Sequence, residues 1–165
     1  MGRWAVVSRH VLTILLSIPI GMAWSSGAAF AQNDRALQQR LARTTALNCT
    51  FSVMVTGDWK GGTPNGEVTI AKIKVTFTKV NADEGTAEAD STFGASFIVV
   101  RYASNYLHLM QMHDTGPLYT TTVLAKETKD GRFMAVHTRH EYTDVRLPGF
   151  TSRPEMYLGE CAVTP

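Results

Sequence analysis

Apolar and polar residues alternate along most of the chain after position 46, and this period of two is typical of half-buried β-strands. In the first such segment Leu47, Cys49 and Phe51 fall on one face, and Val53 and Val55 continue it. The chain contains about eight segments of this kind, separated by short runs rich in Gly, Pro, Asn and Asp. They cover residues 47–56, 68–80, 86–89, 93–102, 106–112, 119–126, 132–142 and 155–163.

The connections between these segments carry turn residues. The one that joins 119–126 to 132–142 contains Asp130-Gly131, which is a strong signal for a β-hairpin. Residues 57–67 are rich in Gly and include Thr63-Pro64-Asn65-Gly66, so we expect a loop there.

The segment 68–80 changes face partway along its length. Val68 and Ile70 share one parity, whereas Ile73 and the apolar residues after it share the other. A β-bulge or a strong bend near Ala71 would bring both sets to the same side of the sheet.

The connections are of hairpin length and no helical segment separates the strands, so parallel crossovers are excluded and an antiparallel meander is expected. An eight-stranded meander can close into an up-and-down barrel, which removes both sheet edges. We therefore predict an all-β fold, an antiparallel up-and-down barrel of about eight strands, with a β-sandwich as the alternative.

Two cysteines favour the barrel over the sandwich. Cys49 lies near the start of the first strand and Cys161 near the end of the last. In a closed barrel these two strands are antiparallel neighbours, so a disulfide between them would join the barrel at its seam. A sandwich with distant terminal strands would not bring the two sulfurs together.

Residues 1–31 have the pattern of a secretory signal peptide. Arg3 and Arg9 precede an apolar run that is too short to span a bilayer, and Ala29-Phe30-Ala31 fits the pattern that a signal peptidase accepts. We place the cleavage before Gln32, and the alternative is an uncleaved membrane anchor. The residue directly after the cleavage position is Gln32 and not a cysteine, so the product is predicted to be a soluble protein of the bacterial periplasm or exterior without a lipid anchor.

Residues 32–46 would form a leader or a short helix, with Leu37 and Leu41 spaced i, i+4, and residues 47–165 a single β-barrel domain. Removing the signal peptide changes 16 basic and 14 acidic residues to 14 of each, so the net charge becomes zero. Bulk charge therefore gives no reason to expect nucleic-acid or acidic-membrane binding. In an oxidising compartment the two cysteines are expected to form a disulfide.

Gly57-Asp58-Trp59 is similar to the short Gly-x-Trp element of lipocalins and avidins, which are small secreted β-barrels. In lipocalins this element opens the first strand, whereas here it lies at the end of that strand. The chain also resembles uncharacterised exported bacterial proteins that have a cysteine in the last strand. These resemblances imply a barrel architecture and identify no ligand.

The segment 106–112 offers a candidate metal site. It places His108, Met110 and Met112 on one face, and imidazole and thioether groups are ligands that suit Cu(I). Successive residues on one face of a strand lie about 7 Å apart, so the three could reach one ion only if the strand bends. The alternative is that both methionines fill space in the core.

The segment 132–142 offers a candidate ligand site. His137 and Arg139 point to the same side of a regular strand and could bind an anion at the barrel mouth. The alternative is a solvated strand end that Glu141 and Asp144 neutralise. Aromatic side chains with polar tips are also favoured at binding surfaces. The residues expected to contact a ligand are Trp59, Tyr102, Tyr119, His137 and Arg139.

The sequence has no Gly-x-Ser-x-Gly, His-Glu-x-x-His or Gly-rich phosphate loop after residue 31, so we expect neither catalysis nor a cofactor. The leading hypothesis is an exported binding protein whose barrel interior or mouth takes a small apolar ligand or a protein loop. The alternatives are the copper module and an inhibitor of a cell-wall-degrading enzyme, or another interaction protein without a pocket, that acts through residues 57–66 or 144–154. Apolar residues on both faces of segment 93–102 would be explained by a helix or a partner subunit, including a second copy, that covers one face.

Overall fold

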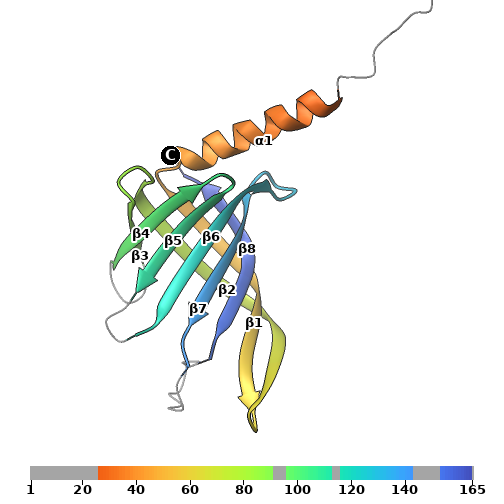
Figure 1. Cartoon of the computed structure of the whole chain (residues 1–165), viewed down its shortest axis with the longest axis vertical. Helices are drawn as coiled ribbons and strands as arrows, with labels where there is room; N and C mark the ends of the chain where they lie inside the picture. The colour runs from red at the N-terminus through yellow and green to blue at the C-terminus, as the bar shows by residue number, and fades with distance from the viewer. Residues whose placement is uncertain (1–25, 91–95, 113–115, 143–152, 165) are drawn as a thin grey trace, which may run out of the picture.

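The computed structural model describes residues 26–90, 96–112, 116–142 and 153–164. Within them the chain forms one helix, α1 (Ser26–Ala42), followed by eight strands (Figure 1). The strands are β1 (Leu47–Lys60), β2 (Thr63–Asn81), β3 (Thr86–Asp90), β4 (Ser96–Ala103), β5 (Tyr106–Met112), β6 (Leu118–Glu127), β7 (Phe133–His140) and β8 (Glu155–Val163). Most of the predicted signal peptide, residues 93–95 of a predicted strand, and residues 144–152 of a predicted loop lie outside the described residues.

Each strand pairs antiparallel with the next, and β1 also pairs with β8, so the sheet closes into a barrel. This topology confirms the predicted up-and-down barrel over the sandwich. The predicted strands 106–112 and 155–163 match β5 and β8 residue for residue, because each begins and ends at a change from alternation to turn residues. The predicted hairpin at Asp130-Gly131 joins β6 to β7.

The predicted disulfide between Cys49 and Cys161 is present and joins the barrel at its seam. The two residues lie directly opposite each other in the pairing of β1 with β8, with their Cα atoms 4.0 Å apart. Both side chains are buried in the core. The bond therefore ties the first strand to the last across 112 positions of the chain.

The expectation of a loop over residues 57–67 is wrong, because β1 and β2 continue through this region as a paired hairpin. The turn itself contains only Gly61 and Gly62, with φ values of 58° and 82°. The favoured two-residue hairpin turn requires a positive φ at both positions, which glycine adopts without strain. Pro64 consequently lies in the strand opposite Trp59, and the hairpin extends past the ends of the other strands (Figure 1).

The inward-facing positions of β1 change from odd to even residue numbers between Phe51 and Met54. Both side chains pack in the core although they lie three positions apart, because the pairing register shifts between Phe51 and Val53. The prediction that Val53 and Val55 continue the inner face is therefore wrong. Their partners in β8 are on its exposed side, and cross-strand partners share a face.

The expected bulge near Ala71 does not turn Val68 and Ile70 toward the core. The register against β1 does shift between Ile70 and Ile73, yet inner and outer positions keep alternating along β2. Val68 is 68% exposed and Ile70 is 85% exposed. The fold thus leaves two large apolar side chains on the outer surface of this strand.

Helix α1 packs across the upper end of the barrel (Figure 1). Leu37 and Leu41 are buried in the same cluster as the upper side chains of the barrel. The Arg40 guanidinium lies 4.2 Å from the centre of the Phe133 ring and pairs with Glu127. These contacts exclude the alternative of a loose leader for the part of the helix that contains them.

Helix α1 also runs across the predicted cleavage position before Gln32. Cleavage there would leave the buried Leu37 and Leu41 on the remaining chain. In the described ranges, no helix is both long enough and apolar enough to cross a membrane.

Candidate functional site

The inner surface of the barrel changes character from one end to the other. Near α1 it consists of fully buried apolar side chains, among them Leu47, Val100, Leu107, Val123 and Phe133. In the lower half, three neighbouring strands place polar and aromatic groups on the inner face. These residues, named here the mouth cluster, are Tyr119 and Thr121 on β6, His137 and Arg139 on β7, and Glu155 and Tyr157 on β8.

Strand pairing arranges the mouth cluster in two rows that cross β6, β7 and β8. Direct cross-strand partners on one face have Cβ atoms about 5 Å apart, so each row is continuous. The row nearer the core is Thr121, His137, Tyr157, and the row nearer the open end is Tyr119, Arg139, Glu155. The regular alternation of three adjacent strands is therefore sufficient to build the cluster.

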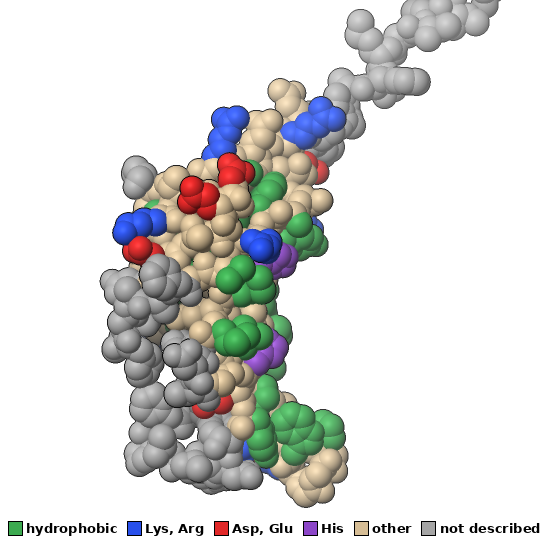
Figure 2. Space-filling view, turned by 60° about the vertical axis from the view of Figure 1, so that its left-hand side comes forward, with side chains coloured by type: hydrophobic (Ala, Val, Ile, Leu, Met, Phe, Trp, Pro, Cys, Tyr) green, Lys and Arg blue, Asp and Glu red, His purple; other side chains and the backbone are tan. Residues whose placement is uncertain are grey.

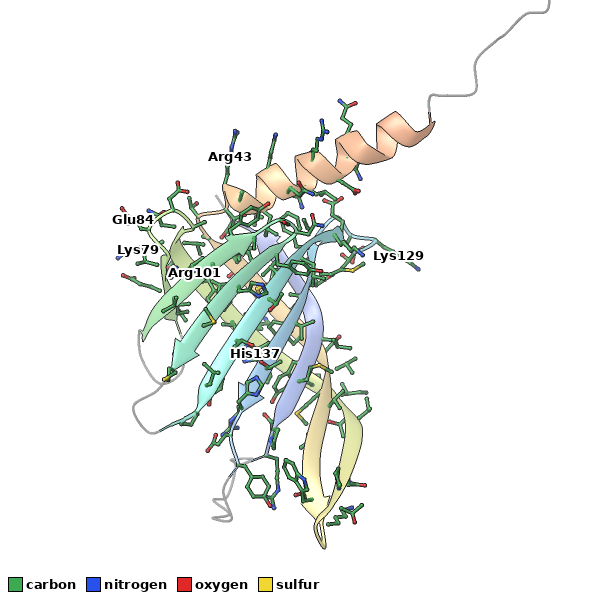
Figure 3. All side chains as sticks on the ribbon, in the orientation of Figure 1. Arg43, Lys79, Glu84, Arg101, Lys129 and His137 are labelled. Carbon is green, nitrogen blue, oxygen red and sulfur yellow. A yellow bond between two sulfur atoms is a disulfide. The ribbon has the colours of Figure 1, made fainter. Side chains whose placement is uncertain are left out.

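His137 occupies the middle of the row nearer the core, in the lower half of the barrel (Figure 3). Its Nδ1 lies 2.8 Å from Thr121 Oγ1, and the rings of Phe51, Tyr119 and Tyr157 have their centres 5.5, 6.0 and 5.8 Å from its own. Burial lowers the pKa of His137 to about 4, so the imidazole is neutral at pH 7. Within the described residues its Nε2 makes no hydrogen bond.

Arg139 is already engaged by carboxylates in the outer row. Its Nε donates to Glu141 Oε2 at 2.8 Å, its Nη2 donates to the same oxygen, and its Nη1 lies 3.7 Å from Glu155 Oε2. Tyr157 donates its hydroxyl to Glu155 at 2.5 Å, and burial together with this carboxylate raises the pKa of Tyr157. Among the residues that the structure describes, Arg139 and the two carboxylates that contact it carry a net charge of −1 beside the neutral imidazole.

We expect acid to destabilise the fold through His137. An unfolded histidine has a pKa of about 6.5, whereas His137 in the barrel has a pKa of about 4. The stability that comes from keeping it neutral is therefore fully present above pH 6.5 and is lost as the pH falls toward 4, by about 3 kcal/mol. Urea unfolding at pH 7, 5.5 and 4 measures this loss.

The matched variant is His137→Phe, which keeps a buried ring without a titrating nitrogen. Between pH 7 and pH 4 it should lose about 3 kcal/mol less than the natural chain. The exposed residue His140 supplies the control, because His140→Phe should retain the natural pH dependence. Identical pH dependence in His137→Phe and the natural chain would contradict burial of the neutral imidazole.

The end of the β1–β2 hairpin lies beside Tyr142, which follows β7, and beside Arg153 and Pro154, which precede β8. The Trp59 ring meets the Tyr142 ring edge-on at 5.2 Å, and Arg153 lies 4.6 Å from the centre of that same ring. Arg153 also pairs with Asp58 at 3.0 Å. The Gly57 amide donates to the backbone carbonyl oxygen of Pro154. These contacts hold a half-exposed indole at the open end of the barrel.

Of the five residues predicted to contact a ligand, three come together in the mouth cluster: Tyr119, His137 and Arg139. Trp59 belongs to the same end of the barrel, on the hairpin. Tyr102 does not join them, because its hydroxyl lies under α1 at 3.1 Å from the Gln38 carbonyl oxygen. His137 is largely enclosed by aromatic rings, so it is not at a solvated strand end. Glu141 does pair with Arg139, as that alternative expected, and Asp144 lies outside the described residues.

Sequence reasoning missed Thr121, Glu155 and Tyr157. A usable signal was present in the last strand, where Glu155 and Tyr157 share parity with Cys161. Since the predicted disulfide places Cys161 in the core, the same alternation places both residues inside the barrel. The buried Glu155 carboxylate is the most informative of the three, because ionisable groups are rarely buried without a partner.

The three candidate copper ligands lie on the outer face of β5. His108 Nδ1 is 3.0 Å from Thr122 Oγ1, and the ring stacks on Tyr106. Met112 is 76% exposed, so the alternative that both methionines fill the core is wrong. The described part of the chain contains no group of three His, Cys, Asp or Glu side chains that could hold a metal ion.

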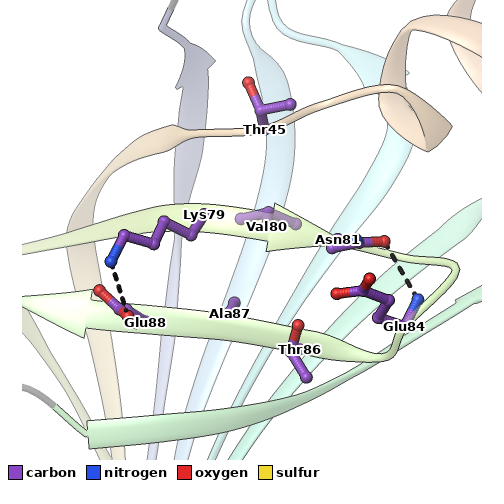
Figure 4. A pocket seen from close by; sticks show the side chains of 8 residues that line it. All are labelled: Thr45, Lys79, Val80, Asn81, Glu84, Thr86, Ala87 and Glu88. Carbon is purple, nitrogen blue, oxygen red and sulfur yellow. Dashed lines mark hydrogen bonds and ion pairs between the residues drawn. The ribbon is translucent and has the colours of Figure 1, made fainter.

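An open surface pocket of about 490 Å³ lies near the upper end, between the start of β1 and the β2–β3 hairpin (Figure 4). Lys79 and Glu88 form an ion pair along one side of it, and Asn81 Oδ1 accepts the backbone amide of Glu84 on the other. The lining charges are thus paired with each other or turned to solvent. The pocket shares no residue with the mouth cluster.

Comparison with models of protein families, with curated proteins and with solved structures finds no match to this chain.

Proposed function

We propose that this protein is a non-enzymatic binding protein that takes a small aromatic molecule, uncharged or positively charged, at the open end of its barrel. The observation that supports this most directly is the partly buried mouth cluster, which places a neutral imidazole and paired charges where apolar side chains would be more stable. Burying such groups costs free energy unless they are paired, and barrels commonly place their binding sites at the mouth. Aromatic rings surround the imidazole on several sides.

The charge of the mouth cluster, taken together with the neighbouring Glu141, sets the expected ligand class. Arg139 is held by Glu141 and Glu155, so it has little capacity left for an anion, and the region carries a net charge of −1. The unpaired Nε2 of His137 supplies one hydrogen-bonding position beside the rings of Tyr119 and Tyr157. These features favour a flat ligand with one polar nitrogen or oxygen over the anion considered from the sequence.

An extracytoplasmic location belongs to the same proposal. The disulfide at the seam is stable in an oxidising compartment, and the N-terminal 31 residues have the pattern of a secretory signal. A binding protein outside the cytoplasm would meet small aromatic compounds directly. Mass spectrometry of the protein from its own host would show the mature N-terminus at Gln32 if the signal is removed as we propose.

Three compounds with one ring system and different charge test the ligand class: indole, tryptamine and indole-3-acetate. In an amide chemical-shift titration, we expect indole and tryptamine to shift residues of the mouth cluster. Indole-3-acetate should bind at least about tenfold more weakly, because its carboxylate meets a net negative site. Shifts confined to other surfaces, or equal binding of all three, would contradict the proposal.

The variant His137→Phe tests whether the imidazole contacts the ligand. It should weaken tryptamine binding several-fold, since a hydrogen bond contributes about 1 kcal/mol. His140→Phe is the control, because His140 lies exposed on the same strand outside the cluster. An equal effect of the two substitutions would remove His137 from the site.

A further inference from the structure

Strand β2 has a long edge with which none of the described strands pairs. It contains 19 residues, but β3 contains five and pairs with β2 only between Thr76 and Asn81. In the described ranges, no strand pairs with the outer edge of residues 63–75. Figure 1 shows this part of β2 in the hairpin that extends beyond the other strands.

The outward side chains along this edge follow a pattern of two apolar residues and then two basic ones. Val68 and Ile70 are 68% and 85% exposed, and Lys72 and Lys74 are exposed as well. Neither lysine forms an ion pair with any part of the chain that the structure describes. Four successive outward positions are therefore available to a partner.

The two apolar side chains continue an apolar surface on the neighbouring strands. Val53 of β1 pairs with Ile70 of β2 on one side and with Leu158 of β8 on the other. Val55 of β1 pairs with Val68 of β2. Leu158 is itself 42% exposed. Figure 2 shows hydrophobic and uncharged side chains at the lower end of the molecule, whereas most charged side chains lie in the upper half. A strand added to β2 would thus extend an existing apolar row.

We infer that the outer edge of β2 binds an extended segment of a partner protein, which pairs antiparallel with residues 67–74. Its side chains would be apolar opposite Val68 and Ile70 and acidic opposite Lys72 and Lys74. Main-chain hydrogen bonds along an open strand edge provide the affinity in this mode of binding, and alternate side chains provide the specificity. Long open edges with exposed apolar residues are otherwise a hazard that proteins avoid.

The charges favour an acidic partner over a second copy of this chain. If two copies paired antiparallel about Thr69, Val68 of each would face Ile70 of the other, but Lys72 would face Gly66. Both lysines would then remain without an acidic neighbour. An acidic and apolar segment satisfies all four outward positions, and cross-strand pairs of opposite charge are stabilising.

The probe for this proposal is the synthetic peptide Glu-Thr-Glu-Thr-Val-Thr-Val-Thr, whose glutamates oppose Lys74 and Lys72 in the antiparallel register. Titrated into the full chain, it should shift the amide signals of residues 63–75 and slow their hydrogen exchange. A second peptide with lysine in place of both glutamates should bind roughly tenfold more weakly, because each opposed pair changes from attractive to repulsive.

A charge exchange in the protein completes the test. The variant Lys72→Glu with Lys74→Glu should reverse the preference, binding the lysine peptide and rejecting the glutamate peptide. The control, Lys126→Glu with Lys129→Glu, makes the same change in net charge at exposed lysines elsewhere and should keep the natural preference.

Three results would overturn the proposal. One is no shift in residues 63–75 with either peptide, and another is an unchanged preference in the charge-exchanged variant. The third is dimerisation in sedimentation velocity that depends on concentration, that Ile70→Lys abolishes, and that the glutamate peptide does not inhibit. The edge would then bind a second copy of the chain. None of these results bears on indole binding at the mouth cluster, so the two proposals fail separately.

Discussion

Replacing Cys49 and Cys161 together with alanine lowers the free energy of unfolding by about 4 to 5 kcal/mol. The disulfide closes a loop of 112 positions, and a crosslink of that length removes much of the conformational freedom of the unfolded chain. Among the described strands, the bond joins the two that are neighbours in space and distant in sequence. Urea unfolding of the natural and double-alanine proteins at pH 7 measures the difference.

Two comparisons separate the crosslink from the side chains. The natural protein under reducing conditions should unfold at nearly the same urea concentration as the double variant, since both lack the bond. The single variants should match the double variant within about 1 kcal/mol, because either one removes the whole crosslink. A loss below about 1 kcal/mol in the double variant would mean that strand pairing alone holds the seam.

Gly159→Ala should destabilise the barrel by about 3 kcal/mol or more. Gly159 lies in β8 opposite Phe51, where the register shift in β1 begins. A Cβ atom at this position would overlap the Thr50 carbonyl oxygen and come within 2.7 Å of Phe51 Cα. Backbone atoms cannot move aside as a flexible side chain can, so the two strands would have to separate at the seam.

Gly57→Ala is the matched control for this prediction. A Cβ atom at Gly57 meets nothing closer than 3.8 Å, which is ordinary van der Waals contact, so the change in stability should stay within about 1 kcal/mol. If Gly159→Ala does not fold while Gly57→Ala does, that result also agrees with the prediction. Similar stability of the two alanine variants would contradict the close approach of β8 to β1.

The architecture could be predicted because its evidence is local. Alternation indicated about eight strands, and the positions of Cys49 and Cys161 in the first and last of them favoured the closed barrel, which the structure shows, over a sandwich. The hairpin at residues 57–67 could not be predicted in the same way. Its glycines suggest a loop, and only the pairing of both strands shows that Gly61 and Gly62 alone form the turn.

The candidate site was predictable in part. The common parity of His137 and Arg139 followed from the strand period, and Tyr119 was expected to contact the same ligand. Glu141, two positions from Arg139, was expected as a neutralising neighbour, whereas the approach of Glu155 to the Arg139 guanidinium depends on β8, another segment of the chain. The net charge of the site, and with it the ligand class, therefore changed once the strands were paired.

By itself the sequence determined the number and order of the strands, most of their residues and which sulfurs meet, because period, turn chemistry and cysteine position are properties of short segments. The tertiary structure alone decided where the faces reverse, as between Phe51 and Met54, and which edge no described strand pairs with, as along residues 63–75 of β2. Both depend on register, the alignment of one strand against another. Register is set by the packing of the whole barrel and leaves no local mark in the chain.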